Sequence, residues 1–269
     1  HIPVGYYKTM HNPKVDWCFH TEKDETMNNR SIRYPRGKTL GGSSSINGLL
    51  WIRGQSNDYD NWRQQGNEGW GWEDVLPYFL KSENNELGKS KFHNDKGPIT
   101  VTNKKIKLKM LEEFQNAVEE MGIPKTNDFN TGDNYGVGYF QFTNSRHQIL
   151  KLRCSAAKGY LNPVKKRSNL KIVVNAHVQK INFEGKKAIS VSYYKGDKIE
   201  TTKANKEILL SAGSIGSPHI LQVSGIGEEK KLRNLGIKIV HELKGVGKNL
   251  QDHLMFRPVY KVKNLKSLN

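Results

Sequence analysis

Cysteine is scarce in this sequence, and long apolar runs are absent. The 269 residues include two cysteines, Cys18 and Cys154, which stand far apart in the chain. Two are too few for a disulfide framework or for a metal site built from cysteines, and they do not indicate a cellular compartment. A membrane-spanning helix needs about 18 consecutive apolar residues or more, and no such run occurs. The sequence therefore predicts no disulfide-stabilised domain, no bound metal and no membrane span.

Acidic residues are also few relative to basic ones. The chain has 26 Asp and Glu against 43 Lys and Arg, a formal net charge of +17. A charge of this size raises nucleic acid as a partner. The basic residues, however, are spread along the chain as single lysines and short runs such as 104–109, and no zinc-finger spacing or RNA-binding aromatic strand accompanies them. We therefore expect a solvated lysine-rich surface and no nucleic acid. Steeply salt-dependent binding would indicate the alternative.

The length fits one large domain or two small ones at about 150 residues per domain. Apolar residues make up 35%, and the 25 Gly and 9 Pro follow no fixed period, which excludes collagen-like and low-complexity chains. The chain opens on His1, and its first residues lack the charged-then-apolar pattern of a leader peptide. We expect it to be an internal part of a longer protein.

Hydrophobic spacing predicts several helices in the first half of the chain. Apolar residues recur at helical spacing over 71–82, where Pro77 lies near the first turn or kinks the helix, and over 108–121, where Gly122 ends it. A third, short helix is predicted over 155–160, capped by its serine. The second of these helices is an ordinary amphipathic one, so packing is its expected role.

Between residues 170 and 212 apolar residues recur at every second position, as in β-strands, instead of at helical spacing. An antiparallel meander is predicted there, and it ends in a strand, around the apolar residues 208–210, that we expect to be buried. A helix opening at Ser217 and another over 228–235 follow. The chain is thus expected to be a mixed α/β protein. The predicted strands are 170–174, 178–183, 188–194, 199–203 and 207–211.

The most informative stretch is residues 35–60, which read PRGKTLGGSSSINGLLWIRGQSNDYD. The double glycine has no side chains to hold a ligand away, and residues 43–46 are expected to start a helix whose free N–H groups suit a pyrophosphate. Asn47 would share a helix face with Ser43, and its amide can donate and accept, as the edge of a heteroaromatic ring requires. Such a run is a flexible turn about as often as a phosphate cradle, and spacing alone leaves both open.

A second stretch, residues 211–227, reads SAGSIGSPHILQVSGIG. The apolar residues before it would deliver a small-residue turn to a helix N-terminus. In α/β folds that arrangement presents backbone N–H groups to phosphates. A tight strand-to-helix connection with no ligand fits the pattern equally well.

Together the two stretches resemble the glucose-methanol-choline (GMC) family of FAD-dependent oxidoreductases, and most closely its insect glucose-dehydrogenase-like branch. The run GKTLGGSSSIN, with Trp51, Gly54 and Asp60, is similar to the family's first signature, and the run from Gly213 is similar to its second. Further similar segments are NWRQQGNEGWGWEDVLPYFLKSEN, YLNPVKKRSNLKIVVNAHVQKI and GVGKNLQDH. The resemblance covers nearly the whole chain.

The resemblance implies which residues hold FAD. In the family, the serine after the double glycine and the Asn-Gly that follows contact the cofactor, and a valine after an NLKIVV-type strand meets the adenine. The second signature lies near the cofactor, and residues 250–253 would close a wall beside it. The implied cofactor-binding residues are Thr39, Gly42, Ser43, Asn47, Gly48, Val178, Gly213 and Ser214.

Two family features are missing. No GxGxxG with a preceding strand and a following acidic residue is present, and the family's catalytic histidine belongs to a segment beyond the point that corresponds to Asn269. Of the nine histidines, His253 is the best substitute base, but we expect it to be structural, and Asp252 either orients a group near the flavin or stabilises a turn. His1 is the chain terminus, and the others are expected to lie in turns or strands without paired carboxylates: His11, His20, His93, His147, His177, His219 and His241. Cys154 is expected to be a buried thiol.

The resemblance implies an FAD/NAD(P)-binding-like fold, incomplete at both ends. Residues 1–255 would form the N-terminal FAD-binding module without its first βαβ unit, and 256–269 would begin the substrate-binding domain. The implied activity is oxidation of a CH–OH group of an alcohol or sugar, as in glucose dehydrogenase: a base takes the hydroxyl proton while hydride passes to the flavin, and a quinone or oxygen accepts the electrons. We expect the 269 residues alone to be inactive, and the insect branch implies export. The alternative is a degenerate paralogue that keeps the scaffold for binding only.

Overall fold

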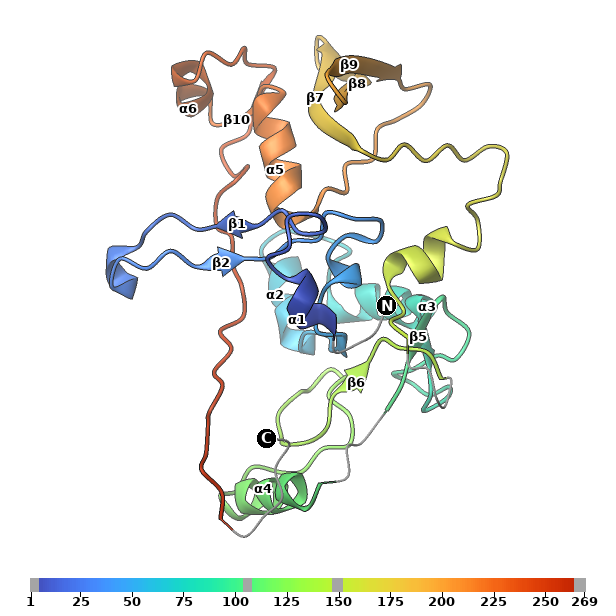
Figure 1. Ribbon diagram of the computed structural model, residues 1–269, viewed down its shortest axis with the longest axis vertical. Helices are drawn as coiled ribbons and strands as arrows, with labels where there is room; N and C mark the ends of the chain where they lie inside the picture. Colours follow the sequence, from blue (N-terminus) through green and yellow to red (C-terminus); the bar gives the residue numbers. More distant parts are fainter. Residues whose placement is uncertain (1–4, 104–107, 147–151, 264–269) are drawn as a thin grey trace. The chain divides into compact units, whose positions relative to one another are not determined.

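The computed structural model describes residues 5–103, 108–146 and 152–263. It divides into two compact units, the first made of His1–Leu170 with Lys261–Asn269 and the second of Lys171–Tyr260 (Figure 1). His1, His147 and most of the lysine run 104–109 lie outside the described residues.

Unit 1 is built from helices and very short paired strands. Its α-helices are α1 (Tyr6–Thr9), α2 (Ser56–Gln64), α3 (Trp72–Ser82) and α4 (Lys109–Glu120). Single turns of other helix types are η2 (Glu25–Met27), η3 (Gly42–Ser45) and the π-type η4 (Ala157–Leu161). Strand β1 (Phe19–His20) pairs antiparallel with β2 (Arg33–Tyr34), β3 (Leu50–Trp51) pairs antiparallel with β6 (Gln141–Phe142), and β4 (Glu83–Asn85) pairs parallel with β5 (Ile99–Val101).

The predicted helix at 71–82 is confirmed as α3, and its sequence explains where it begins. The Asp74 carboxylate accepts from the Gly71 N–H at 3.0 Å, which satisfies a donor that the helix start leaves free. Trp72 and Leu76 are buried, and the Trp72 and Tyr59 rings lie 5.7 Å apart. Pro77 stands inside the helix, which continues through it to Ser82. α3 thus packs through one apolar face.

The other two predicted helices of unit 1 are also present. α4 ends before Gly122, whose φ of +87° suits glycine. η4 forms where the short helix was predicted, and it packs closely because Gly159 has no side chain: an added Cβ would lie 2.7 Å from the Ile99 side chain. The small core beside it consists of Ile99, Val101 and Cys154, with Trp51 packed against them. Burial of the Cys154 thiol, expected from the sequence, is confirmed.

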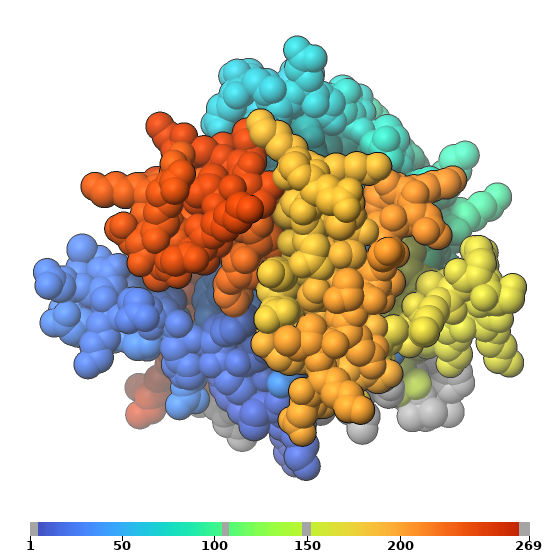
Figure 2. Space-filling model, turned by 90° about the horizontal axis from the view of Figure 1, so that it is seen from above, coloured from blue at the N-terminus to red at the C-terminus, as the bar shows by residue number. Residues whose placement is uncertain are grey.

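Unit 2 contains the predicted meander. Strands β7 (Ala176–Glu184), β8 (Lys187–Lys195) and β9 (Lys198–Lys203) form an antiparallel sheet in the order β7-β8-β9, seen as a gold block in Figure 2. Gly185 and Gly196 turn the chain between them with φ of +56° and +60°. After the sheet come α5 (Gly213–Val223), β10 (Ile226–Gly227), α6 (Glu229–Asn234) and β11 (His241–Glu242), with β10 and β11 paired in parallel.

Three sequence predictions in and beside unit 2 are wrong. Residues 170–174 and 207–211 form no strand, and Leu209 is 80% exposed. A strand needs a hydrogen-bonding partner, and the described residues place none beside these segments. Helix α5 begins at Gly213 and not at Ser217. The Ser217 hydroxyl instead accepts from the Ala212 N–H at 3.0 Å, from inside the first turns, so the Ser-Pro pair does not mark the helix start.

Candidate cofactor site

The glycine-serine turn (residues 39–48) contains one tight 3₁₀ turn, where the sequence predicted the start of a helix. Gly41 and Gly42 have φ of +87° and +54°, a region that glycine tolerates without strain. The Ser44 hydroxyl donates to the Gly41 carbonyl at 2.5 Å, and the Ser45 hydroxyl donates to the Leu40 carbonyl at 2.8 Å. These side-chain bonds compete with helix propagation, so only the 3₁₀ turn η3 forms.

Asn47 closes this turn with its amide held in one orientation. Its Oδ1 accepts from Arg153 Nη1 at 2.6 Å and from the Leu49 N–H at 3.1 Å. Two donors on one oxygen use its lone pairs and assign it as the carbonyl end of the amide. The side chain is exposed. Asn47 therefore offers its NH₂ group outward as a donor, where the sequence reading allowed it to donate and accept.

The structure brings five predicted cofactor-binding residues onto this one turn. The Thr39 carbonyl accepts from the Gly42 N–H at 2.8 Å, and the Ser43 hydroxyl accepts from the Gly37 N–H at 3.1 Å. Four of these residues are exposed, and Gly42 is half-buried. The turn thus presents hydroxyl, amide and backbone donors together. The five are Thr39, Gly42, Ser43, Asn47 and Gly48.

Arg153 lies behind the turn, and sequence reasoning assigned it no role. It is 4% exposed, and it donates to the Ser44 carbonyl at 3.1 Å and to the Asn47 carbonyl at 2.7 Å, in addition to the Asn47 amide. Burial lowers the pKa of its guanidinium. The nearby Ala156 N–H donates to the Ser44 hydroxyl at 2.9 Å. The one sequence feature that could have indicated this role is an arginine among small and polar residues, over a hundred positions after the turn.

The remaining predicted residues belong to unit 2, which contains a cavity of about 400 Å³. Ser214, at the start of α5, and Leu250 both line it. Gly213 and Val178 are not among the lining residues. The lining consists of Ser214, Ile215, Pro218, His219, Gln222, Lys231, Gly247, Lys248, Asn249, Leu250 and Gln251.

Two contacts hold the wall of this cavity against its helices. Gln222, on α5, donates from Nε2 to the Val246 carbonyl at 3.0 Å, and Gly247 packs against the same side chain. Lys248 Nζ lies 2.6 Å from Glu228 Oε2, and this bond keeps the pKa of the Glu228 carboxyl below its ordinary value. The cavity therefore has amide and ammonium donors beside apolar atoms. That donor set fits a ligand with phosphates and a ring.

Unit 1 also contains a buried cluster of charged side chains, away from the glycine-serine turn. Glu83 is fully buried; its carboxylate lies 2.9 Å from Arg53 Nη2 and 2.9 Å from His93 Nδ1. His93 Nε2 lies 2.7 Å from Asp128 Oδ2. The sequence reading of His93 as a histidine without paired carboxylates is wrong, because two carboxylates distant in sequence flank its ring. We call Arg53, Glu83, His93 and Asp128 the buried charge cluster.

Hydrogen bonds set the protonation of this cluster. Burial alone would lower the pKa of His93, but the bonds to Asp128 and Glu83 outweigh burial and raise it from 6.5 to about 9. Burial would raise the pKa of Glu83 and of Asp128, but their bonds to His93 keep both below their ordinary values. His93 is thus an imidazolium between two carboxylates at neutral pH, and it is a poor general base.

Stability should fall as pH rises through the titration of His93. Because the folded pKa lies above the unfolded one, its contribution is complete below pH 6.5 and is lost as pH rises through about 9. We expect a loss of about 1–3 kcal/mol in the free energy of unfolding over that window. Urea titrations at stepped pH measure it. His93→Gln should remove this slope, whereas His20→Gln, at an exposed histidine, should retain it; an unchanged slope in His93→Gln would contradict the assignment.

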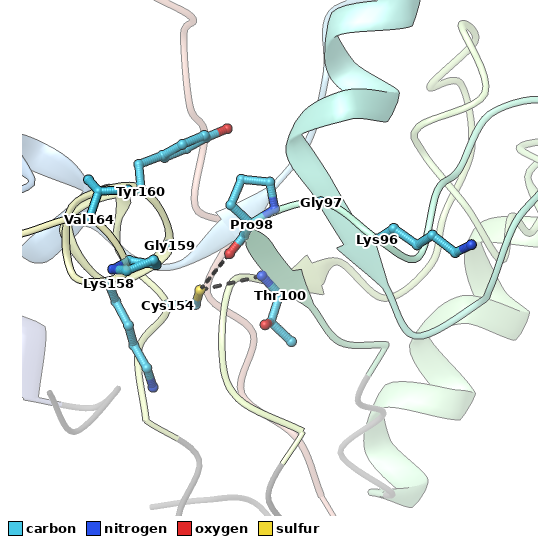
Figure 3. Close-up of a pocket in the computed structure, with 10 residues that line it drawn as sticks. Lys96, Gly97, Pro98, Thr100, Cys154, Lys158, Gly159, Tyr160 and Val164 are labelled. Atoms are coloured by element: carbon cyan, nitrogen blue, oxygen red, sulfur yellow. Dashed lines mark hydrogen bonds between the residues drawn. The ribbon is translucent and has the colours of Figure 1, made fainter. Parts of the chain in front are cut away.

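Unit 1 also contains a cavity, of about 530 Å³, which lies beside η4 (Figure 3). Cys154 lines it, with its sulfur accepting from the Thr100 N–H at 3.3 Å and lying 3.9 Å from the Pro98 carbonyl. Lys96, Lys158 and Tyr160 contribute to the rim. None of the predicted cofactor residues lines this cavity.

Within residues 5–103, 108–146 and 152–263, no group of three or more His, Cys, Asp or Glu is placed to hold a metal ion. No helix in that part of the chain has the length and apolar character needed to cross a membrane.

A family comparison decides the identity of the fold. The model of the GMC oxidoreductase N-terminal region, described as GMC oxidoreductase, matches residues 18–255. The chain belongs to the GMC oxidoreductase family. The resemblance to the GMC family is thereby confirmed, as is FAD as the family's cofactor, whereas the comparisons do not show the insect glucose-dehydrogenase-like branch. The mixed α/β fold with an antiparallel meander is confirmed as well.

Relatives and solved structures agree with this assignment. An oxygen-dependent choline dehydrogenase of Pectobacterium carotovorum is 40% identical over 99% of this chain and 48% of its own length. The mitochondrial choline dehydrogenase of Homo sapiens is 38% identical over 94% of this chain and 42% of its own. The crystal structure of pyridoxine 4-oxidase from Mesorbium loti matches with a TM-score of 0.86 and 27% identity over 93% of this chain and 49% of that one. The GMC chain thus spans about half the length of the relatives it matches.

Proposed function

We propose that this GMC chain forms the FAD-binding part of an oxidoreductase that acts on the CH–OH group of a small alcohol. One observation carries the proposal beyond family membership. Ser214 and Leu250 come from two stretches that the resemblance independently places near the cofactor, and they line one cavity in unit 2. Local contacts through Gln222 keep them there.

Each unit contains candidate groups for holding the cofactor. In unit 1 the glycine-serine turn supplies exposed donors, of which the Asn47 NH₂ is the one fixed in direction. In unit 2 the candidate groups are the backbone at Gly213 and Ser214 and the strand residue Val178. FAD, when bound, supplies the hydride acceptor for oxidation of the alcohol carbon. The chain's own residues bind and orient it.

We propose that the base for the hydroxyl proton and the ADP-binding unit come from sequence outside the 269 residues. The support is that these residues contain no GxGxxG unit and match about half of their relatives' length. His93 is not assigned as the base, because both of its ring nitrogens are paired with carboxylates, one with Glu83 and the other with Asp128. On this proposal the 269 residues alone are inactive, and residues 256–269 begin a substrate-binding domain.

The relatives guide the choice of substrate class. Besides the choline dehydrogenases, an alcohol dehydrogenase [acceptor] of Pseudomonas putida is 40% identical over 94% of this chain and 46% of its own. We therefore propose a small alcohol first. A sugar, as in a glucose-dehydrogenase-like member, is the second candidate, and it rests on the resemblance to the insect branch. That branch also supports export, with a quinone or oxygen as electron acceptor.

The test uses the full-length protein that contains this chain. The purified protein should show a flavin absorbance spectrum, which anaerobic addition of choline, a primary alcohol or glucose should bleach. Bleaching by one compound assigns the substrate class. Flavin that stays oxidised with every donor would favour the degenerate, non-catalytic paralogue, and absence of flavin from the folded protein would overturn the proposal.

A further inference from the structure

Arg153 is a buried cation whose partners are all uncharged. Its guanidinium donates to two backbone carbonyls and one side-chain amide, at Ser44 and Asn47. Among the described residues, no carboxylate forms an ion pair with it. A buried charge is costly unless it is well hydrogen-bonded, and bonds to a charged donor are stronger than neutral ones. The cost is met by contacts to one short segment, the glycine-serine turn.

The shortest of the three contacts fixes a side chain and not the backbone. Arg153 Nη1 lies 2.6 Å from Asn47 Oδ1, and the Leu49 N–H takes the second lone pair of that oxygen. An amide held this way cannot flip, so its NH₂ faces away from Arg153. Drawing electron density toward Oδ1 also makes the NH₂ a stronger donor, because hydrogen bonds in a chain polarise one another.

We propose that Arg153 is a positioning residue that fixes the Asn47 amide as a one-way donor to the cofactor. This inference rests on the proposed function, in which Asn47 contacts FAD. The two backbone bonds hold the turn, and the bond to Oδ1 selects which end of the amide meets the ligand. The cofactor atom that Asn47 addresses must therefore be an acceptor.

A double-mutant cycle on FAD affinity tests the proposal. In the full-length protein, Arg153→Met should weaken FAD binding about 10- to 100-fold, the loss expected for hydrogen bonds to a charged group. In the Asn47→Ala background the same change should cost at least fivefold less, because the amide through which Arg153 acts is gone. The visible circular dichroism of bound flavin should change alike in Arg153→Met and Asn47→Ala.

Arg146 offers a matched control, since its Nη2 donates to the Asn84 and Asn85 carbonyls away from the turn. Arg146→Lys should leave FAD affinity unchanged. If Arg153→Met does not fold, Arg153→Lys replaces it in the same cycle. An equal loss in both backgrounds would overturn the positioning role, while wild-type protein that folds but binds no FAD would overturn the proposed function itself and this inference with it.

Discussion

Replacing Glu83 with alanine should lower the free energy of unfolding by about 3–5 kcal/mol, the cost of removing one partner from a buried ion pair. The Glu83 carboxylate is fully buried and serves several donors: it accepts from Trp51 Nε1 at 3.0 Å and from the Asn94 N–H at 3.1 Å, besides Arg53 and His93. Without it, the guanidinium of Arg53 would be left buried with backbone carbonyls alone.

Urea denaturation of Glu83→Ala and of Glu119→Ala measures this difference. Glu119 pairs with Lys125 at 2.6 Å, but their side chains are 52% and 39% exposed, so its removal should cost less than about 1 kcal/mol. Glu83→Gln keeps the acceptor oxygen and should fall between the two. Equal losses in Glu83→Ala and Glu119→Ala would show that the buried charge cluster contributes no more than a surface pair.

Replacing Gly225 with alanine should cost about 2–4 kcal/mol, and it should also disturb the cavity of unit 2. Gly225 has φ of +92°, where a side chain is strained, and an added Cβ would collide with the Lys238 carbonyl and lie 3.0 Å from the Val240 side chain. The Gly225 carbonyl accepts from the Val240 N–H at 2.8 Å, next to the pairing of β10 with β11. A shift there moves the segment that leads into residues 247–251.

Gly236 is the matched control for this substitution. Its φ is +71°, but an added Cβ would meet nothing within 4 Å. Gly236→Ala should therefore cost only the backbone strain, about 1–2 kcal/mol. Thermal and urea unfolding of the two variants separate strain from collision, and FAD titration reports on the cavity. If both variants lose the same stability, close packing at Gly225 contributes nothing.

The family and most of the local elements were predictable because their causes lie within a few residues. Helices α3 and α4 follow from apolar spacing with an acidic first turn or a glycine stop, and the meander β7-β8-β9 follows from alternation with turn glycines. The strand predicted at 207–211 was wrong because a strand depends on a neighbour that its own residues do not specify.

In the candidate site too, residues close in sequence were predictable and a distant partner was not. Pattern and family resemblance chose Thr39, Gly42, Ser43, Asn47 and Gly48, and the structure gathers them on one turn because they are close in sequence. The stabilising arginine could not be read from the pattern. Arg153 stands 106 positions from Asn47. The residues around an arginine in a polar segment do not show whether its side chain is buried and hydrogen-bonded or exposed to solvent.

The amino-acid sequence by itself determined the GMC family of this chain, because its two signature stretches occur in the family's order, although it predicted a helix start where the 3₁₀ turn η3 forms. Only the tertiary structure decided the electrostatics. His93 is an imidazolium because Glu83 and Asp128, from other parts of the chain, are brought to both of its nitrogens, and its ring is buried. A pKa or a hydrogen bond depends on distance and burial in space, which separation along the chain does not encode.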